Sequence, residues 1–237
     1  MASDLVILYE DNHLLAVAKP GGLLAQGDRT GDPTALELAR AYVKASRGKP
    51  GKAFLGLVHR LDRPVSGVLL FARTSKAAGR LARAFAERDV EKTYLAVVVG
   101  EPRQDEGTLT GYIERTHLRS RLAPRPTPDA REATLSYRVL ERRGQGSLLV
   151  VAPETGRHHQ IRLQLGSEGM PIAGDLKYGA PEALPDRTIA LHAVALRVPH
   201  PVRDELVYIV ATPPATPPWS SFARVIESFL AKLSSPR

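Results

Sequence analysis

One stretch of this 237-residue chain decides its fold: His59-Arg60-Leu61-Asp62-Arg63-Pro64-Val65-Ser66-Gly67. An uninterrupted apolar run, residues 68–72, follows and predicts a buried strand. The carboxylate of Asp62 therefore lies just ahead of a buried strand and two positions after Arg60. Burying an acid costs solvation free energy, so Asp62 needs a cationic partner or a chemical purpose.

The charge of the chain favours a polyanionic partner. It has 33 Lys and Arg against 25 Asp and Glu, a formal net charge of +8, while its hydrophobic fraction of 43% is ordinary for a globular protein. Nucleic acid is a better match for this excess than a membrane surface. On charge alone, a basic protein without any role on nucleic acid remains an alternative.

The absence of cysteine excludes several kinds of chemistry. It rules out disulfides, thiolate metal sites and cysteine nucleophiles, including RNA modification by thiolate attack on a pyrimidine. The first residues do not resemble a signal peptide, and no stretch approaches the roughly 18 uncharged apolar residues of a membrane span. We expect a soluble, cytoplasmic protein without membrane association.

The first half of the chain predicts alternating strands and helices. Residues 5–9 and 14–18 read as a strand pair around a polar turn. Thr34 and Glu37 form a capping box, which starts a helix that ends near Ser46. A loop carrying Arg47, Lys49 and Lys52 leads to the Asp62 stretch. Thr74 or Ser75 caps a helix to about Glu87, with Leu81 and Phe85 inward, and residues 93–99 form a strand.

The second half predicts mostly strands. Residues 133–139 and 147–151 form a strand pair, and further strands cover residues 189–198 and 206–210. Thr155 is expected to cap a helix over about residues 157–167, with Ile161 and Leu165 inward and Gly169 at its end. A Pro-rich connector, residues 213–218, precedes a final helix with Phe222, Ile226 and Phe229 on one face. Residues 115–131 read as a long basic loop or hairpin, with Arg115, Arg119, Arg121, Arg125 and Arg131.

Further motifs accompany the Asp62 stretch. Lys92-Thr93-Tyr94-Leu95-Ala96-Val97-Val98-Val99-Gly100 places a tyrosine on a strand, and Gly156-Arg157-His158-His159-Gln160-Ile161-Arg162 ends in an arginine. An early turn, Lys19-Pro20-Gly21-Gly22, and a stretch from Gly169 to Gly179 that includes Asp175 and Tyr178 complete the pattern, with Leu191-His192-Ala193 and His200-Pro201 near the end. In this order and over nearly the whole chain, the motifs resemble the RluA-type pseudouridine synthases.

The resemblance implies a fold and an activity. The fold is α+β: a mixed, mostly antiparallel sheet with flanking helices and a central cleft for RNA. The activity is site-specific isomerisation of uridine to pseudouridine in structured RNA, either ribosomal or transfer RNA, without a cofactor or a metal. We expect a monomer with a catalytic domain over residues 1–212. The connector and helix of residues 213–237 would dock on it.

The resemblance also implies roles for individual residues. Asp62 is the essential catalytic residue and acts on a flipped-out uridine, either by attack at C1′ or by removal of a ribose proton. Tyr94 stacks on the base and takes part in proton removal at C5, and Arg162 pairs with Asp62. Arg60 fills the space that the flipped base leaves. The remaining residues expected to bind RNA are His59, Arg157, His159 and Lys19.

Alternatives and departures stay open at this point. Tyr94 alone could be a core tyrosine, and an Asp62–Arg162 pair could be purely structural. A non-catalytic RNA-binding factor on the same scaffold would use the basic segment of residues 115–131. A serine hydrolase at Ser66 is disfavoured because Pro64 stands where the nucleophile elbow needs glycine. The departures from the family pattern are Val65 for threonine, Gln164 for a common histidine, and the absence of an N-terminal S4-type domain.

His158 and His159 invite a metal site, which we reject. If both lay on a helix, adjacent side chains would point about 100° apart, and no spaced acidic ligand or cysteine supports them. His159 and Gln160 are instead expected to orient the helix and Arg162.

Overall fold

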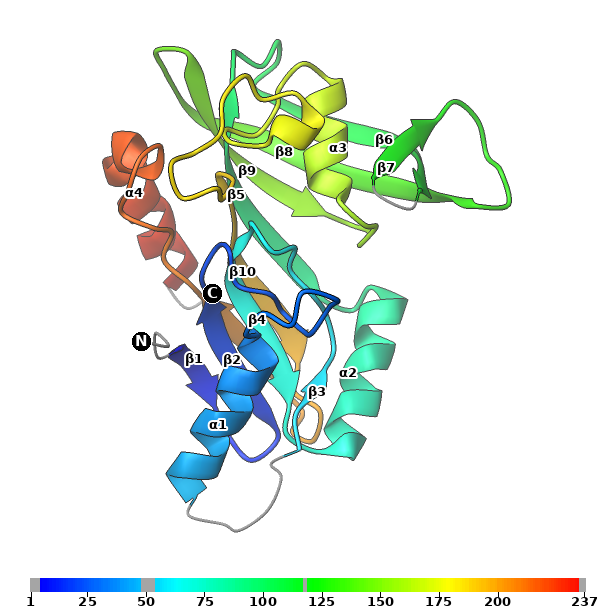
Figure 1. Ribbon diagram of the computed structural model, residues 1–237, viewed down its shortest axis with the longest axis vertical. Coiled ribbons are helices and arrows are strands. Elements are labelled where there is room, and N and C mark those ends of the chain that lie inside the picture. The colour runs from blue at the N-terminus through cyan, green and yellow to red at the C-terminus, as the bar shows by residue number, and fades with distance from the viewer. Residues whose placement is uncertain (1–4, 48–53, 117–118, 235–237) are drawn as a thin grey trace. The chain divides into compact units, whose positions relative to one another are not determined.

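The computed structural model describes residues 5–47, 54–116 and 119–234, which fold into two compact units (Figure 1). Unit 1 comprises Met1–Glu91 and Ala193–Ala211, and unit 2 comprises Lys92–His192 and Thr212–Arg237. Each unit combines strands with helices, which confirms the α+β class. Lys49 and Lys52, expected in a basic loop, lie outside the described residues.

Unit 1 is a sheet with a helix against each face. Its strands follow the order β1-β2-β4-β10, with β3 paired to β4 and β11 paired to β10. The pairings β1–β2, β2–β4, β3–β4 and β10–β11 are antiparallel. The elements are β1 (Val6–Glu10), β2 (Leu14–Lys19), α1 (Ala35–Arg47), β3 (Gly56–Leu57), β4 (Ser66–Ala72), α2 (Ser75–Glu87), β10 (Leu191–Pro199) and β11 (Leu206–Val210).

The apolar runs of β2 and β4 are explained by burial on both faces of the sheet. Alternate residues such as Leu15 and Phe71 face α1 and pack with Ala39 and Val43. The residues between them face α2 and its Leu81. The second core also contains Leu196, Val198, Val207, Ile209 and Ala211. Both cores lie directly behind the turn that carries Asp62.

The predicted caps fix where the helices of unit 1 begin. Thr34 Oγ1 accepts from the Glu37 N–H (3.1 Å), and Glu37 Oε2 accepts from the Thr34 N–H (3.1 Å), so the capping box is confirmed. Thr74, not Ser75, caps α2, since its Oγ1 accepts from the Ala77 N–H at 3.1 Å. Each helix therefore starts where a side chain satisfies its first backbone donors.

Unit 2 is an antiparallel sheet in the order β5-β9-β8-β6-β7, with α3 packed on one face. Ile113, Ala133 and Leu163 form the core between sheet and helix. The elements are β5 (Glu91–Val99), β6 (Glu106–Arg115), β7 (Ser120–Ala123), β8 (Ala130–Arg143), β9 (Gly146–Pro153), α3 (Gln160–Ser167), the 3₁₀ turns η1 (Leu176–Tyr178) and η2 (Trp219–Phe222), and α4 (Ala223–Ser234).

The basic segment of residues 115–131 belongs to a β-hairpin. Strands β6 and β7 pair antiparallel, and the chain then returns into β8 beside β6. The hairpin alternative is therefore correct, although residues 117–118 lie outside the described part of the chain. Because β7 pairs only with β6, it forms the edge of this sheet.

The predicted start of α3 was wrong. Thr155 does not cap the helix, which begins at Gln160 instead of near Arg157. The Thr155 hydroxyl donates to Gln160 Oε1 (2.7 Å) and accepts from the Thr134 N–H (3.0 Å). Residues 156–159 form a turn in which His159 has φ +56°. This left-handed conformation is incompatible with a right-handed helix, so α3 cannot begin before Gln160.

The C-terminal helix packs within unit 2. Trp219, Phe222 and Ile226 are buried, and Arg143 Nη1 donates to the Ser221 carbonyl oxygen at 2.7 Å. Phe222 and Ile226 are two of the three residues that the sequence placed on the inner face; the third, Phe229, is half-buried. No helix in the described residues is both long enough and apolar enough to cross a membrane.

Candidate active site

Asp62 lies half-buried on a short turn of unit 1. Its carbonyl oxygen accepts from the Val65 N–H at 3.0 Å, which closes the turn ahead of β4. Leu61 and Val65, on either side of the turn, are both buried. The sequence therefore places the carboxylate on a rigid base at the start of a buried strand.

Gly67 explains why the Asp62 stretch ends in glycine. Its φ is +121°, and a Cβ at this position would lie 2.3 Å from the Ala193 carbonyl oxygen and 2.5 Å from its nitrogen. Ala193 belongs to the Leu191-His192-Ala193 motif on β10. Two motifs 126 residues apart (193 − 67) are thus joined by a backbone contact that only glycine permits.

Lys19 is bonded to the same turn through its side chain. The side chain is buried, and Nζ donates to the carbonyl oxygens of Pro20 (2.9 Å), Leu23 (2.7 Å) and Arg63 (3.2 Å). The pKa of Lys19 is lowered to about 7, mainly by burial. The charge of Asp62 raises this pKa and the charge of Arg63 lowers it. The Lys19 Nζ thus bonds the backbone of Arg63, the residue immediately after Asp62. The predicted contact of Lys19 with RNA stays a prediction.

Arg63 clips the turn to the segment after β2. Its Nε donates to the Gly22 carbonyl oxygen (3.0 Å), and its own carbonyl oxygen accepts from the Gly22 N–H (2.8 Å). Arg63 Nη2 also pairs with Asp32 at 2.8 Å, on the surface. Nothing in the sequence signals this contact, because Gly22 and Asp32 become neighbours of Arg63 only through folding.

His59 and Arg60 have opposite surroundings. His59 Nε2 accepts from the Leu70 N–H at 3.0 Å, and its ring stacks on Phe85 with centroids 5.0 Å apart. Arg60 is exposed, and no residue in the described part of the chain forms a hydrogen bond or ion pair with its side chain. His59 therefore helps to hold the stretch, whereas the Arg60 guanidinium is available to a partner.

Tyr94 is half-buried on β5, opposite Val151 of β9. Lys92, two residues earlier, points to the same side of the strand, and its Nζ donates to the Thr155 carbonyl oxygen at 3.2 Å. Tyr94 belongs to unit 2 and Asp62 to unit 1. The stacking role expected for Tyr94 stays a prediction.

Arg162 is buried at the start of α3, where Asp175 holds it through two hydrogen bonds. Nε donates to Asp175 Oδ2 (2.6 Å) and Nη2 donates to Oδ1 (2.8 Å), in the fork geometry that suits a guanidinium. The Arg162 Cζ lies 5.3 Å from the centre of the Tyr178 ring. Sequence reasoning missed Asp175 as a partner, and the expected pairing of Arg162 with Asp62 stays a prediction.

The argument that His158 and His159 must diverge was wrong, because they lie in the turn before α3 and not on the helix. Their rings stack with centroids 3.7 Å apart. His158 Nδ1 lies 2.9 Å from Ser120 Oγ, and His159 Nδ1 lies 2.8 Å from the Tyr178 hydroxyl. Within the described residues, no group of three or more His, Cys, Asp or Glu residues could hold a metal ion.

Arg157 and Gln164 are both held by backbone carbonyls of the sheet of unit 2. Arg157 Nε donates to the Glu132 carbonyl oxygen at 2.8 Å. Gln164 Nε2 donates to the carbonyl oxygens of Leu109 (2.9 Å) and Ala133 (3.2 Å), so the glutamine that replaces the usual histidine bonds α3 to the sheet.

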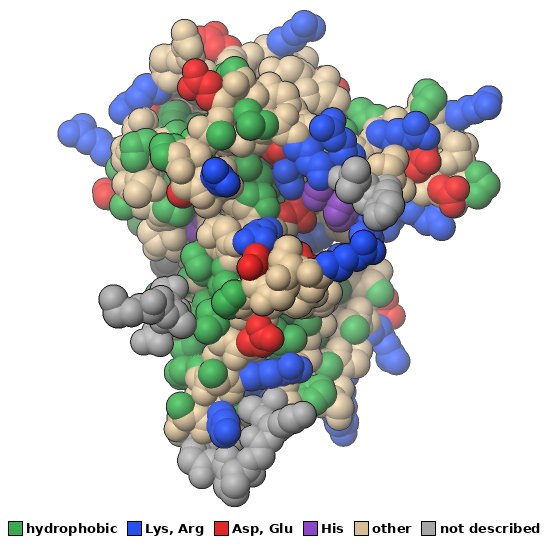
Figure 2. All heavy atoms as spheres, in the orientation of Figure 1, with side chains coloured by type: hydrophobic (Ala, Val, Ile, Leu, Met, Phe, Trp, Pro, Cys, Tyr) green, Lys and Arg blue, Asp and Glu red, His purple; other side chains and the backbone are tan. Residues whose placement is uncertain are grey.

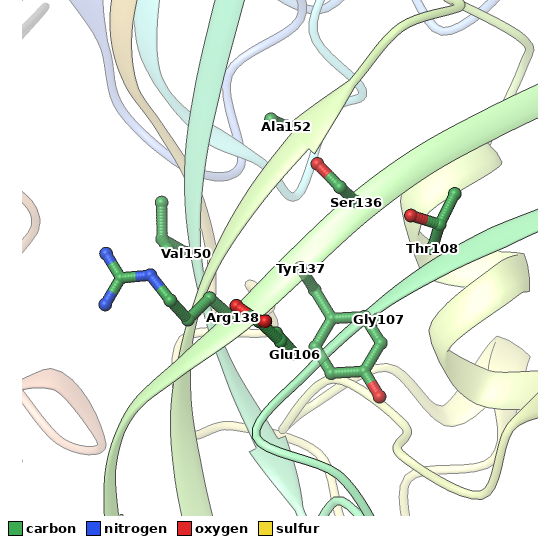
Figure 3. Close-up of a pocket in the computed structure, with 8 residues that line it drawn as sticks. All are labelled: Glu106, Gly107, Thr108, Ser136, Tyr137, Arg138, Val150 and Ala152. Carbon is green, nitrogen blue, oxygen red and sulfur yellow. The ribbon is translucent and has the colours of Figure 1, made fainter.

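A hollow of ≈ 530 Å³ lies over the sheet of unit 2, and none of the predicted site residues lines it (Figure 3). It is lined by Glu106, Gly107, Thr108, Ser136, Tyr137, Arg138, Val150 and Ala152. Thr108, Ser136 and Ala152 are register partners on neighbouring strands, so the hollow follows one face of β6, β8 and β9.

Basic side chains gather on the β6–β7 hairpin, at the upper right of Figure 2. Arg115, Arg119, Arg121 and Arg125 are all exposed. Only Arg121 among them has an acidic partner in the described residues, with Nη2 3.1 Å from Glu114 Oε2. The hairpin therefore presents positive charge to a polyanion.

Comparisons with known proteins agree with these features. A family model described as RNA pseudouridylate synthase matches residues 13–167. The chain is 35% identical over 216 residues to the uncharacterized RNA pseudouridine synthase YhcT of Bacillus subtilis, with 90% of this chain and 70% of that protein covered. It is 37% identical over 221 residues to the ribosomal large subunit pseudouridine synthase D of Xanthomonas campestris, with 88% and 66% covered.

Solved structures show the same fold. The human RNA pseudouridylate synthase domain containing 4 superposes with a TM-score of 0.76 at 25% identity, over 94% of this chain and 92% of that one. The expected α+β fold is thus confirmed as that of pseudouridylate synthase domains. The chain spans about two thirds of the length of the curated relatives that it matches, between 65% and 70% for the first of them.

Proposed function

Because the chain belongs to the RNA pseudouridylate synthase family, a family of isomerases, we propose that it converts uridine to pseudouridine at defined positions of a structured RNA. The observation that carries the proposal is the turn of Asp62. A half-buried carboxylate stands there on a rigid base, beside an exposed Arg60 and above the buried Lys19 ammonium. A structural acid at the surface would need none of this support.

Ribosomal RNA is the first substrate to test. The name of the Xanthomonas relative refers to the large ribosomal subunit, and other relatives share that wording. Transfer RNA is the second. The basic hairpin and the net charge of +8 suit either polyanion.

The reaction rearranges one nucleoside and needs no second substrate. The uridine leaves the base stack, at a cost of a few kcal/mol, and the Arg60 guanidinium fills the space. Asp62 then attacks C1′ or removes a ribose proton, and the bond between N1 and C1′ breaks. The uracil turns and C5 bonds to C1′, which either displaces the Asp62 carboxylate from C1′ or is accompanied by return of the proton from Asp62 to the ribose. C5 then loses its proton with the help of Tyr94, and N1 gains a proton. Balanced in this way, the isomerisation consumes no cofactor.

The other predicted residues support this reaction. Arg162 stabilises the ionised form of Asp62, since a nearby guanidinium favours a carboxylate. His59, Arg157 and His159 contribute to RNA binding, and the buried Lys19 acts through the turn of Asp62. The catalytic domain covers residues 1–212, the connector and helix of residues 213–237 dock on it, and the protein acts as a monomer in the cytoplasm.

The test is the substitution Asp62→Asn, which keeps the shape of the side chain and removes its charge. We expect loss of pseudouridine formation on total ribosomal or transfer RNA, measured by mapping pseudouridines, with unchanged RNA binding. Asp204→Asn is the matched control, because Asp204 is exposed and far along the chain on the loop before β11. Retained activity of Asp62→Asn would remove Asp62 from its role.

A second variant, Arg60→Ala, tests base flipping. We expect it to slow modification of uridines within duplexes more than of uridines in loops, because only the former leave a stacked gap. Equal loss on both kinds of RNA would contradict the role of Arg60.

A further inference from the structure

A chain of hydrogen bonds joins the basic hairpin to Tyr178, whose ring lies over the buried Arg162 guanidinium of α3. Ser120, the first residue of β7, donates through Oγ to the His158 carbonyl oxygen (2.7 Å) and lies 2.9 Å from His158 Nδ1. Its backbone N–H donates to the Tyr178 hydroxyl at 3.1 Å. The same hydroxyl lies 2.8 Å from His159 Nδ1. The Tyr178 hydroxyl is therefore fixed from two sides.

The Tyr178 ring in turn covers the Arg162 guanidinium. Arg162 Cζ lies 5.3 Å from the ring centre, and Asp175 holds the Nε edge of the same guanidinium. Tyr178 is tightly seated on α3, since a Cβ at Gly166 would lie 2.4 Å from the Tyr178 carbonyl oxygen. One side of the guanidinium is thus fixed by a carboxylate and one face by a ring, and a cation–π contact of this kind holds its plane.

Ser120 is buried, whereas its neighbours Arg119 and Arg121 are exposed. The hairpin therefore carries charge on its outer side and an anchor on its inner side. Within the described residues β7 pairs with β6 alone, and the bonds of Ser120 connect this edge strand to Tyr178 of η1 and to the turn before α3.

We propose that Ser120 and Tyr178 are positioning residues: the Ser120 backbone holds the Tyr178 hydroxyl, the Ser120 side chain holds the turn of His158, and together they fix the Arg162 guanidinium in the orientation used in catalysis and link it to the RNA-binding hairpin. This inference rests on the proposed function for its effect on the reaction, but the fixing of Arg162 belongs to the protein alone. Neither residue touches the uridine; both act through Arg162.

The kinetic test separates this role from RNA binding. Tyr178→Phe removes only the hydroxyl and leaves the ring, and Ser120→Ala removes the anchor on the hairpin. We expect each to lower kcat roughly 10- to 100-fold with KM for RNA unchanged, because a displaced catalytic group slows chemistry and not binding. The double variant should lose less than the product of the two single losses, since the Ser120 side chain acts on Arg162 by way of the His158–His159 turn and the Tyr178 hydroxyl. Arg119→Gln, on the outer side of the hairpin, should instead raise KM.

Tyr112→Phe is the matched control, because Tyr112 lies on β6 of the same hairpin, opposite Ala123, and outside this chain of bonds. It should change neither constant. If Ser120→Ala raises KM with kcat unchanged, Ser120 serves only the hairpin and the inference fails. Additive losses in the double variant would also overturn it.

A second readout needs no activity. In the protein without RNA, hydrogen exchange of the Arg162 Nε–H, followed by NMR, should be about tenfold or more faster in Tyr178→Phe and in Ser120→Ala than in the wild type and Tyr112→Phe. Unchanged exchange overturns the inference even if the protein makes pseudouridine. If exchange is faster in the two variants but the wild-type protein makes no pseudouridine, the positioning role stands and the proposed function is refuted instead.

Discussion

Gly67 shows how one residue can tie two distant motifs together. Its backbone lies against Ala193 with φ +121°, so Gly67→Ala would combine a strained backbone with a clash against main-chain atoms that cannot rotate away. We expect the substitution to lower the free energy of unfolding by about 3 kcal/mol or more, measured by urea denaturation.

The control for Gly67 is Gly144→Ala, in the turn between β8 and β9. Gly144 also has a positive φ, +58°, but no atom lies within 4 Å of the place of a Cβ. It should lose only about 1–2 kcal/mol, the cost of a left-handed backbone. Equal losses at the two positions would show that φ, and not the contact with Ala193, dominates.

Lys19 makes stability depend on pH in a defined window. Its pKa is about 7 in the folded protein and near 10.5 when exposed. Between these values the unfolded chain binds more protons, so the free energy of unfolding rises with pH, by at most about 1.4 kcal/mol per pH unit. Below pH 7 the penalty of burying the ammonium is fully present, and above pH 10.5 it is gone.

The variant Lys19→Met removes this titration. Measured by urea denaturation from pH 6 to pH 10, the wild type should gain stability relative to Lys19→Met as the pH rises through this window. A stability difference that is constant over the window would show that Lys19 titrates normally in the folded protein.

Single residues were predictable where the sequence places them in one short stretch. The position of Asp62 and Arg60 just ahead of a buried strand could be read directly, because an apolar run follows them, while their roles stay predictions. The partner of Arg162 could not: Asp175 lies 13 residues further along (175 − 162), after the end of α3, and only packing brings them together. Ser120 carries no local signal at all, since its bonds run to residues about 40 and 60 positions away.

Caps decide where the helices begin, and α2 offers the clearest test. Thr74→Ala removes the acceptor of the Ala77 N–H and should lower the free energy of unfolding by about 1 kcal/mol. Ser75→Ala, one residue later and exposed, should change it by less than about 0.5 kcal/mol. Circular dichroism melts of the two variants measure the difference, and equal effects would contradict the assignment of Thr74 as the cap.

At the scale of elements, the sequence predicted strands and helices well where period and cap agree. The apolar runs of β2 and β4, the capping box of α1 and the Thr74 cap of α2 belong to this class. The start of α3 was missed because the Thr155 hydroxyl is taken by the Gln160 side chain, a tertiary bond that capping rules do not include. The same turn brought the rings of His158 and His159 together, against the expectation for a helix.

The charge of the whole molecule predicts how RNA binding responds to salt. Arg119 and Arg125 are exposed on the hairpin and have no acidic partner in the described part of the chain. If each neutralises one phosphate, the double variant Arg119→Gln, Arg125→Gln should flatten the slope of log K against log salt by roughly 1.4 to 1.8. Titrations of RNA between 50 and 200 mM salt, about the usual working range, measure this slope.

The control is a second double variant that lowers the net charge by the same amount as Arg119→Gln with Arg125→Gln. Arg103→Gln with Arg224→Gln also removes two charges, from exposed positions on the β5–β6 connection and on α4. It should leave the slope nearly unchanged. Equal flattening in both double variants would mean that RNA responds to the overall charge and not to the hairpin.

The two-unit organisation is the part of the molecule that the sequence did not reveal. Strand propensities locate β10 and β11, but not that they complete the cores of the first ninety or so residues. Pairing between strands so far apart depends on the topology of the sheet, which local patterns do not encode.

Unit 1 is built from two separate segments of the chain, which affects how the protein folds during translation. Once residue 91 has been made, translation must add another 120 residues (211 − 91), taking roughly 6 to 24 s at the usual elongation rates, before β11 is complete. During that interval the core that β2 and β4 share with β10 and β11 is incomplete, so apolar side chains of β2 and β4 stay exposed. We therefore expect chaperones to bind this chain early in its synthesis.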